Sequence, residues 1–189
     1  AEVGCPVLIT YGPQLDAPLR EALTWPAEMI DRFSWSRDLG TKDPFGMGVD
    51  TTREVWKEPL GVVGVIVPWN FPVEIILNKL GPVLAMGNTC VLKPAPDTPW
   101  NATRIGRLVA ERTDFPPGVV NVVTSSDHLV GEVLTTSPEV DMVAFTGSTA
   151  TGRVVARRAG ERLIGMSAEL GGKNAMVVTD DVELDRAVE

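Results

Sequence analysis

From residue 61 onward, short runs of apolar and often β-branched residues alternate with amphipathic segments. The runs lack the apolar–polar alternation of a strand with one wet face, which predicts strands that are buried on both faces. We expect strands at residues 62–67, 89–93, 119–123, 141–145, 163–169 and 174–178. Helical segments at residues 72–87, 99–113, 127–137 and 149–160 separate the first five. Successive strand–helix–strand units predict a doubly wound α/β domain with a parallel, Rossmann-like sheet.

The first fifty residues have a different pattern. Between residues 13 and 39, apolar side chains recur at helical spacing, which predicts a helical lead-in that Pro26 kinks or splits. Residues 40–50 contain three glycines and a proline, so we expect a loop there, and residues 51–60 alternate like an exposed strand. We therefore divide the chain into a helical lead-in with a loop, residues 1–50, and an α/β domain, residues 51–189.

Composition narrows the range of partners and compartments. The net charge of −8, from 17 basic and 25 acidic residues, argues against nucleic acid or an anionic membrane surface as a partner. The longest apolar stretch, residues 61–67, is too short to cross a bilayer. Cys5 and Cys90 are too few for a disulfide framework, so we expect a reducing, cytoplasmic location. His128 is the only histidine and has no ligand partners at metal-site spacing, so we expect no metal.

Ligands of doubly wound sheets bind beyond the carboxyl ends of the strands, so the residues after each strand are the candidates for chemistry. The first such stretch is PWNFP, residues 68–72, in which two prolines stiffen the backbone around Asn70. A fixed side-chain amide at this place can stabilise a developing oxyanion. The alternative is a turn in which Asn70 only bonds to backbone groups.

The next two strand ends carry groups that suit a nucleotide. Lys93, in KPAPDTP, can bind a ribose hydroxyl or a phosphate, or can be a solvated lysine. FTGSTATG, residues 145–152, brings Gly147 and Ser148 to the start of a helix, where free amides and the helix dipole favour phosphate. An ordinary turn capped by Ser148 or Thr149 is the alternative.

The fifth strand ends in AELGGK, in which Glu169 precedes two glycines. Glu169 can act as a general base, or can be an exposed carboxylate at the end of a strand. A base needs a nucleophile to activate, and Cys90 lies inside an apolar strand, where a thiol is normally inert. We expect Cys5 to lie unpaired in a loop.

The motifs PWNFP, GNTCVLKPAPDTP, PPGVVNVV, FTGSTATG and ELGGK follow one another in an order and spacing that resemble the aldehyde dehydrogenase superfamily. The resemblance covers residues 51–189 strongly. It implies oxidation of an aldehyde to a carboxylic acid with NAD or NADP, through a cysteine thioester.

The resemblance implies a role for each strand end. Asn70 would donate its amide to the thiohemiacetal oxyanion, and Glu169 would activate the water that hydrolyses the thioester. Lys93 would bind the adenosine ribose. The diphosphate would lie against Gly147 and Ser148, and the cofactor cleft would be lined in part by Pro68 and Trp69.

The sequence departs from the family pattern in three ways. The family's cysteine nucleophile lies downstream of ELGGK, where this chain has none, so we expect a fragment that binds dinucleotide but oxidises no aldehyde by itself. Pro96 stands where many members have a glutamate that repels a 2′-phosphate, although Asp97 is adjacent. We therefore expect both NAD and NADP to bind, with a slight preference for NAD. Ala150 replaces a frequent acidic residue, with little expected consequence.

Other hypotheses stay open beside this one. The chain can be a non-catalytic dinucleotide-binding module, or a relative that acylates coenzyme A or acts on a semialdehyde. In its full-length form we expect a homo-oligomer, in which the exposed strand near residues 53–59 takes part.

Overall fold

A five-stranded parallel sheet forms the centre of the molecule, in a computed structural model that describes residues 13–43, 45–172, 175, 177–183 and 185. The strand order is β5-β4-β3-β6-β7, and all neighbours run parallel. The strands are β3 (Val62–Ile66), β4 (Thr89–Lys93), β5 (Val120–Val122), β6 (Met142–Gly147) and β7 (Gly165–Leu170). This order confirms the doubly wound α/β fold, and places the switch in winding direction between β3 and β6.

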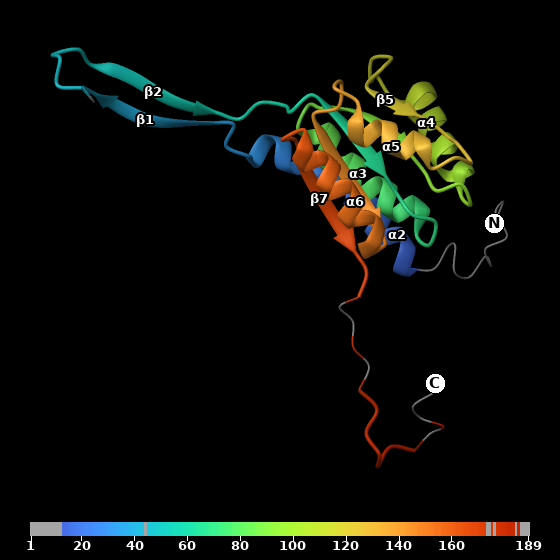
Figure 1. The fold of residues 1–189 in the computed structure, drawn as a ribbon. Helices are drawn as coiled ribbons and strands as arrows, with labels where there is room; N and C mark the ends of the chain where they lie inside the picture. The colour runs from blue at the N-terminus through green and yellow to red at the C-terminus, as the bar shows by residue number, and fades with distance from the viewer. Residues whose placement is uncertain (1–12, 44, 173–174, 176, 184, 186–189) are drawn as a thin grey trace.

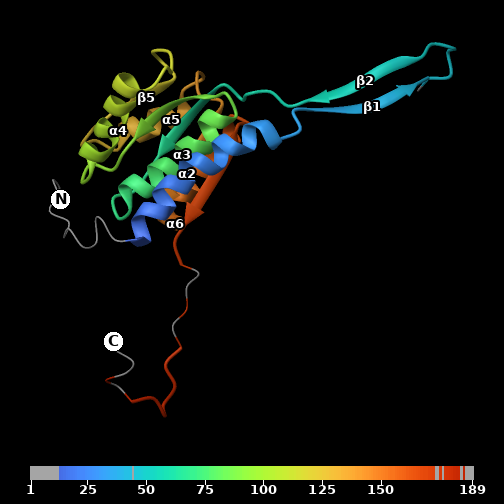
Figure 2. The same cartoon turned by 180° about the vertical axis from the view of Figure 1, so that it is seen from behind.

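Helices cover both faces of the sheet (Figures 1 and 2). The helices on one face are α3 (Pro72–Ala85) and α4 (Pro99–Arg112), and those on the other are α5 (Leu129–Thr136) and α6 (Thr149–Glu161). Each face has its own apolar core. Ile76 and Leu80 of α3 pack in one cluster, and Leu134 of α5 and Val155 of α6 pack in the other.

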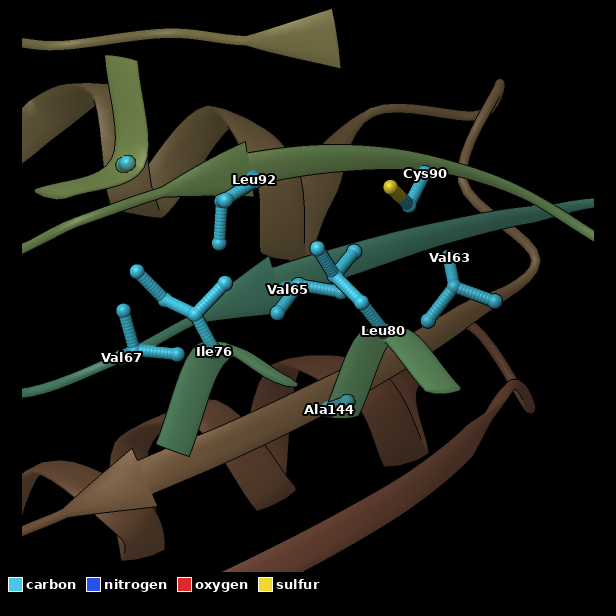
Figure 3. Packing of buried hydrophobic residues seen from close by; sticks show 9 residues of the cluster. Val63, Val65, Val67, Ile76, Leu80, Cys90, Leu92 and Ala144 are labelled. Atoms are coloured by element: carbon cyan, nitrogen blue, oxygen red, sulfur yellow. The ribbon is translucent and has the colours of Figure 1, made fainter. Parts of the chain in front are cut away.

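Burial of the strands on both faces explains their unbroken apolar runs. On β3, Val63 and Val65 point toward Ile76 and Leu80 of α3 (Figure 3). Ile66, the next residue after Val65, packs instead in the cluster beneath α5 and α6. Both faces of a central strand are therefore covered, and no position along it favours a polar side chain.

The predicted strand at residues 174–178 is wrong as far as the structure describes it. Residues 175, 177 and 178 are in no strand, and residues 174 and 176 lie outside the described residues. Gly172, after β7, has a φ of 101°, and the described residues 177–183 lie away from the sheet (Figure 1). A strand needs a neighbour for its backbone hydrogen bonds, and an apolar sequence without such a neighbour forms none.

The N-terminal part differs from the prediction at two points. A single helix, α2 (Pro13–Arg32), runs through Pro26, so of the two predicted alternatives, a kink or a split, the split does not occur. Pro26 and Ala22 are buried against α3, where a Cβ added at Gly81 would collide with the Ala22 carbonyl oxygen. This close packing of α2 on α3 stabilises the helix across the proline.

The helix also ends earlier than residue 39. Residues 36–42 form strand β1 (Ser36–Lys42), which pairs antiparallel with β2 (Thr51–Trp56), so the loop expected from residue 40 begins only after Lys42. The Trp35 indole donates to the Ile30 carbonyl at 2.9 Å, and the Lys57 amide donates to the Trp35 carbonyl at 2.9 Å. The hairpin projects from the body of the molecule (Figures 1 and 2), and the division between residues 50 and 51 falls within it.

A buried asparagine joins the entry of β3 to the entry of β4. The Asn88 side chain, 7% exposed, accepts from the amides of Leu60 at 2.6 Å and Gly61 at 3.1 Å. Its own amide donates to the Val83 carbonyl at 3.2 Å. The Asn88 side chain thus provides hydrogen-bond partners for backbone groups at the amino end of the sheet.

Asn88→Ala should lower the free energy of unfolding by about 2–3 kcal/mol, because two backbone amides lose their acceptor. Urea denaturation followed by circular dichroism measures this change. Asn101→Ala, on the half-buried side of α4, is the matched control and should change the stability by less than about 0.5 kcal/mol. Equal effects of the two substitutions would contradict the role of Asn88.

Candidate functional site

The sheet register brings the candidate residues to one edge. Ile66 pairs with Lys93 on one side and with Phe145 on the other, and Thr146 pairs with Glu169. Lys93 and Glu169 therefore stand at the carboxyl ends of β4 and β7. The segment with Asn70 leaves β3 at the same edge, and Ser148 leaves β6 there.

Side-chain alternation divides these residues between the two faces of the sheet. Lys93 points to the α5–α6 face, where it lines a cavity together with His128 and Thr151. Glu169 points to the α3 face, where it lines a second cavity with Lys79. A ligand that contacts both residues must therefore cross the carboxyl edge of the sheet.

The Lys93 side chain lies in a cavity of about 160 Å³ between α5 and α6, and Lys93 is only 6% exposed. Its ammonium donates to the Pro94 carbonyl at 3.0 Å and forms no ion pair with the described residues. Burial lowers the pKa of Lys93 below its ordinary value. A buried cation without a carboxylate partner suits a ligand that brings hydroxyl or phosphate oxygens.

The start of α6 is both a capped turn and a potential anion site. The Ser148 hydroxyl oxygen accepts from the Thr151 amide at 3.2 Å, so Ser148 is the N-cap, as the alternative interpretation expected. Helix geometry leaves the amides of Thr149 and Ala150 without intrahelical acceptors. A Cβ at Gly147 would lie 2.6 Å from the Phe145 ring, so any larger residue here would force that buried ring to shift.

The segment after β3 holds three exposed side chains, Trp69, Asn70 and Phe71, between Pro68 and the start of α3 at Pro72. Within the described part of the chain, the Asn70 amide makes no hydrogen bond, and α3 has no side-chain cap from Phe71. The turn therefore does not use Asn70 for its own backbone. The amide stays free to donate to a bound group.

Glu169 is exposed at the side of an open cavity of about 560 Å³ that α3 shares with β6 and β7. The Lys79 ammonium lines the same cavity and donates to the Phe145 carbonyl at 3.4 Å. Burial lowers the pKa of Lys79, and the negative charge of Glu169 raises it to a smaller extent. Glu169 thus has a cation as a neighbour on the face opposite to Lys93.

Lys79 is a site residue that the sequence analysis missed. A signal for it exists, because Lys79 follows Ile75 by four residues and precedes Val83 by four, so a charge stands on the apolar face of α3. A lysine on such a face either reaches out to solvent or meets a polar partner. Here it points into the cavity of Glu169.

The cysteine that the structure describes does not suit nucleophilic chemistry. Cys90 is fully buried on β4, and burial raises the pKa of its thiol to about 11. Cys5 lies outside the described residues. Among the residues that are described, no cluster of metal-ligating side chains occurs, and no helix is long and apolar enough to span a membrane.

The fold defines the class of the molecule: a Rossmann-like, doubly wound α/β domain. Residues 14–189 match the model of the aldehyde dehydrogenase family. The chain belongs to this family.

Relatives and solved structures agree with that membership. The chain is 48% identical over 133 residues to aldehyde dehydrogenase 1A1 of Bos taurus, a match that covers 70% of this chain and 26% of that protein. It is 43% identical over 177 residues to succinate-semialdehyde dehydrogenase (NADP(+)) GabD of Escherichia coli strain K12. This match covers 91% of this chain and 36% of that protein. The structure of the aldehyde dehydrogenase of Mycobacterium tuberculosis, complexed with NAD+, superposes on this chain with a TM-score of 0.80 at 39% identity. The superposition covers 98% of this chain and 36% of that chain. The chain thus spans about a quarter to a third of the length of these proteins.

The buried position of Cys90 leads to a labelling experiment. In a Cys5→Ser background at pH 8, Cys90 should react with iodoacetamide about 100-fold more slowly than in the unfolded chain, because a thiol with a pKa near 11 is almost entirely protonated. The rate should rise as the pH approaches 11. Mass spectrometry of timed samples measures the rate, and equal rates in the native and unfolded chains would contradict the inert role.

Proposed function

We propose that this chain is the cofactor-binding part of an NAD(P)-dependent aldehyde dehydrogenase, which oxidises an aldehyde to a carboxylic acid through a cysteine thioester. The observation that carries the proposal is the division of the site across one sheet edge. Lys93 and the start of α6 offer a cation and free amides on one face, and Glu169 lies on the other. A dinucleotide is an elongated ligand that can bind across such an edge.

The residues on the α5–α6 side fit the adenosine end of a dinucleotide. Lys93 would donate to ribose oxygens from its buried position. The amides of Thr149 and Ala150, at the positive end of the α6 dipole, would hold the diphosphate beside Gly147 and Ser148. Pro68 and Trp69 would line the cleft at the other side of the edge. When bound, the nicotinamide ring would provide the hydride acceptor for the oxidation.

The residues on the α3 side fit the steps of acyl chemistry. Asn70 would donate its free amide to the oxyanion that develops on the substrate carbonyl. Glu169 would accept a proton from the water that hydrolyses the thioester. The Lys79 ammonium, in the same cavity, would balance the charge of the carboxylate before this proton transfer. The chain itself carries only Cys5 and Cys90, so the thiol would come from another part of the enzyme.

A non-catalytic dinucleotide-binding module is the second candidate for the chain as it stands. The burial of Cys90 favours it, because the thiol cannot reach the cavity of Glu169 from the interior of β4. The two candidates differ in turnover. Aldehyde-dependent formation of NADH by the 189-residue chain would exclude the second, whereas binding of dinucleotide without turnover agrees with both.

The surroundings of Pro96 support binding of both NAD and NADP. A cavity of about 550 Å³ beside Pro96 is lined by hydroxyl groups, and no carboxylate is among its described lining residues. The hydroxyl groups belong to Thr103, Thr124, Ser125 and Ser126. A 2′-phosphate there would meet hydrogen-bonding groups and no direct like charge.

The proposal also covers the cellular compartment of the protein, its self-association and its class of substrate. We place the protein in a reducing, cytoplasmic environment, which the small number of cysteines supports. Self-association would use the projecting β1–β2 hairpin, on which Leu39, Val55 and Trp56 are exposed. A small-molecule aldehyde would be the substrate, with no nucleic acid or membrane as partner, since the net charge is −8.

Lys93→Met should weaken the binding of both NAD+ and NADP+ by about 10-fold or more, because a charged hydrogen bond to the ribose is lost. Isothermal titration calorimetry on the 189-residue chain measures the dissociation constants. Arg104→Met, at an exposed position of α4, is the control and should leave both constants unchanged. The role of Lys93 would fail if the two substitutions had the same effect.

Substitution of Pro96 tests the basis of cofactor choice. The wild-type chain should bind NAD+ and NADP+ with dissociation constants within about tenfold of each other, since no carboxylate is among the described residues that line the cavity. Pro96→Glu should weaken NADP+ by about tenfold or more and leave NAD+ nearly unchanged, because it adds a negative charge beside the 2′-phosphate.

Pro96→Gln is the matched control for Pro96→Glu, since it adds a side chain of similar size without charge. It should preserve the wild-type ratio of the two dissociation constants. An equal loss for both cofactors in Pro96→Glu, or the same shift in Pro96→Gln, would show that the charge at this position does not determine the choice.

A further inference from the structure

An ion pair joins α5 to α6 across the cavity that Lys93 lines. Glu132 Oε2 lies 3.1 Å from Arg158 Nη2, and the two side chains are 40% and 23% exposed. Both residues line the cavity. Glu132 comes from the first turn of α5 and Arg158 from the last turn of α6, so the pair bridges the two helices along one side of the cavity.

The rest of the cavity is largely apolar. Ile66 and Phe145 form its sheet side, and Val154 and Val155 form its α6 side. Gly131 of α5 lies against the stem of Lys93, where an added Cβ would be 3.5 Å from the lysine side chain. A flat ring system can lie between such walls and place its polar edge against the ion pair that joins the two helices.

The next step rests on the proposed function. If Lys93 binds the adenosine ribose, the base attached to that ribose lies beside Lys93, and the cavity between α5 and α6 is the described space that adjoins this side chain. An adenine edge presents an amino donor next to a ring-nitrogen acceptor. A carboxylate only accepts hydrogen bonds and a guanidinium only donates them, so the Glu132–Arg158 pair complements that edge.

We infer that Glu132 and Arg158 determine the preference of this site for an adenine base. Glu132 accepts a hydrogen bond from the exocyclic amino group, and Arg158 donates one to the adjacent ring nitrogen. Hypoxanthine carries an oxygen in place of that amino group and a protonated nitrogen beside it. In the same pose it faces Glu132 with an acceptor and Arg158 with a donor, and both contacts become unfavourable.

A purely structural ion pair predicts something different. If the pair only held α5 against α6, its loss would loosen the cavity and weaken every dinucleotide to the same extent. The ratio of affinities for two bases is therefore the informative quantity. The chain offers a matched control in the Arg107–Glu111 pair of α4, which is 2.7 Å long, exposed at 65% and 49%, and lines no cavity described in the structure.

The test compares NAD+ with nicotinamide hypoxanthine dinucleotide by calorimetry on the 189-residue chain. The wild type should bind NAD+ at least about tenfold more tightly, which corresponds to one well-formed discriminating contact. Glu132→Gln should reduce this ratio at least threefold, because a carboxamide can either accept or donate. Arg158→Gln should reduce it similarly and serves as the second variant if the first fails to fold. Glu111→Gln should leave the ratio unchanged.

A wild-type ratio below tenfold would overturn the inference, as would a reduction of less than threefold in the folded variants or an equal reduction in Glu111→Gln. Failure of the proposed function gives a distinct result, because the wild-type chain would then bind neither dinucleotide. Circular dichroism of each variant establishes that it is folded before the titration.

Discussion

The backbone register of the parallel sheet is the constraint on which the rest of the site depends. Side chains along a strand alternate between the two faces, so the position of Lys93 in β4 directs it to the α5–α6 side, and the position of Glu169 in β7 directs it to the α3 side. A slip of one residue in either strand would move its side chain to the opposite face. The apolar residues on both faces oppose such a slip, since it would exchange the contents of two packed cores.

The junction of β6 with α6 connects the two halves of the site. Gly152, in the first turns of α6, packs so closely on β7 that an added Cβ would lie 2.5 Å from Leu170 Cδ2. The helix start proposed to offer amides to a diphosphate is therefore fixed against the strand that carries Glu169. A change that lifted α6 from the sheet would alter both the proposed anion site and the position of the proposed general base, Glu169.

Much of this arrangement follows from sequence, and the exceptions have physical causes. Apolar runs rich in β-branched residues predict β3 and β4, and an apolar run predicts β6, because burial on both faces leaves one kind of residue in these inner strands. The hairpin strand at residues 36–42, SRDLGTK, has no such run, and its pairing with β2 decides its conformation. The cavity role of Lys79 depends on which face of α3 meets β6 and β7, a tertiary relation that helical periodicity does not contain.

Ser148 illustrates why two interpretations of one residue need not exclude each other. As the N-cap it binds the Thr151 amide, which is the third amide of α6, and this bond leaves the first two amides available. Capping fixes the direction in which these amides point. No acidic residue stands in the first turn of α6, because Ala150 occupies the place where many family members carry one. The field of the helix start is therefore unopposed by its own first turn, and the feature that stabilises the turn also prepares it for an anion.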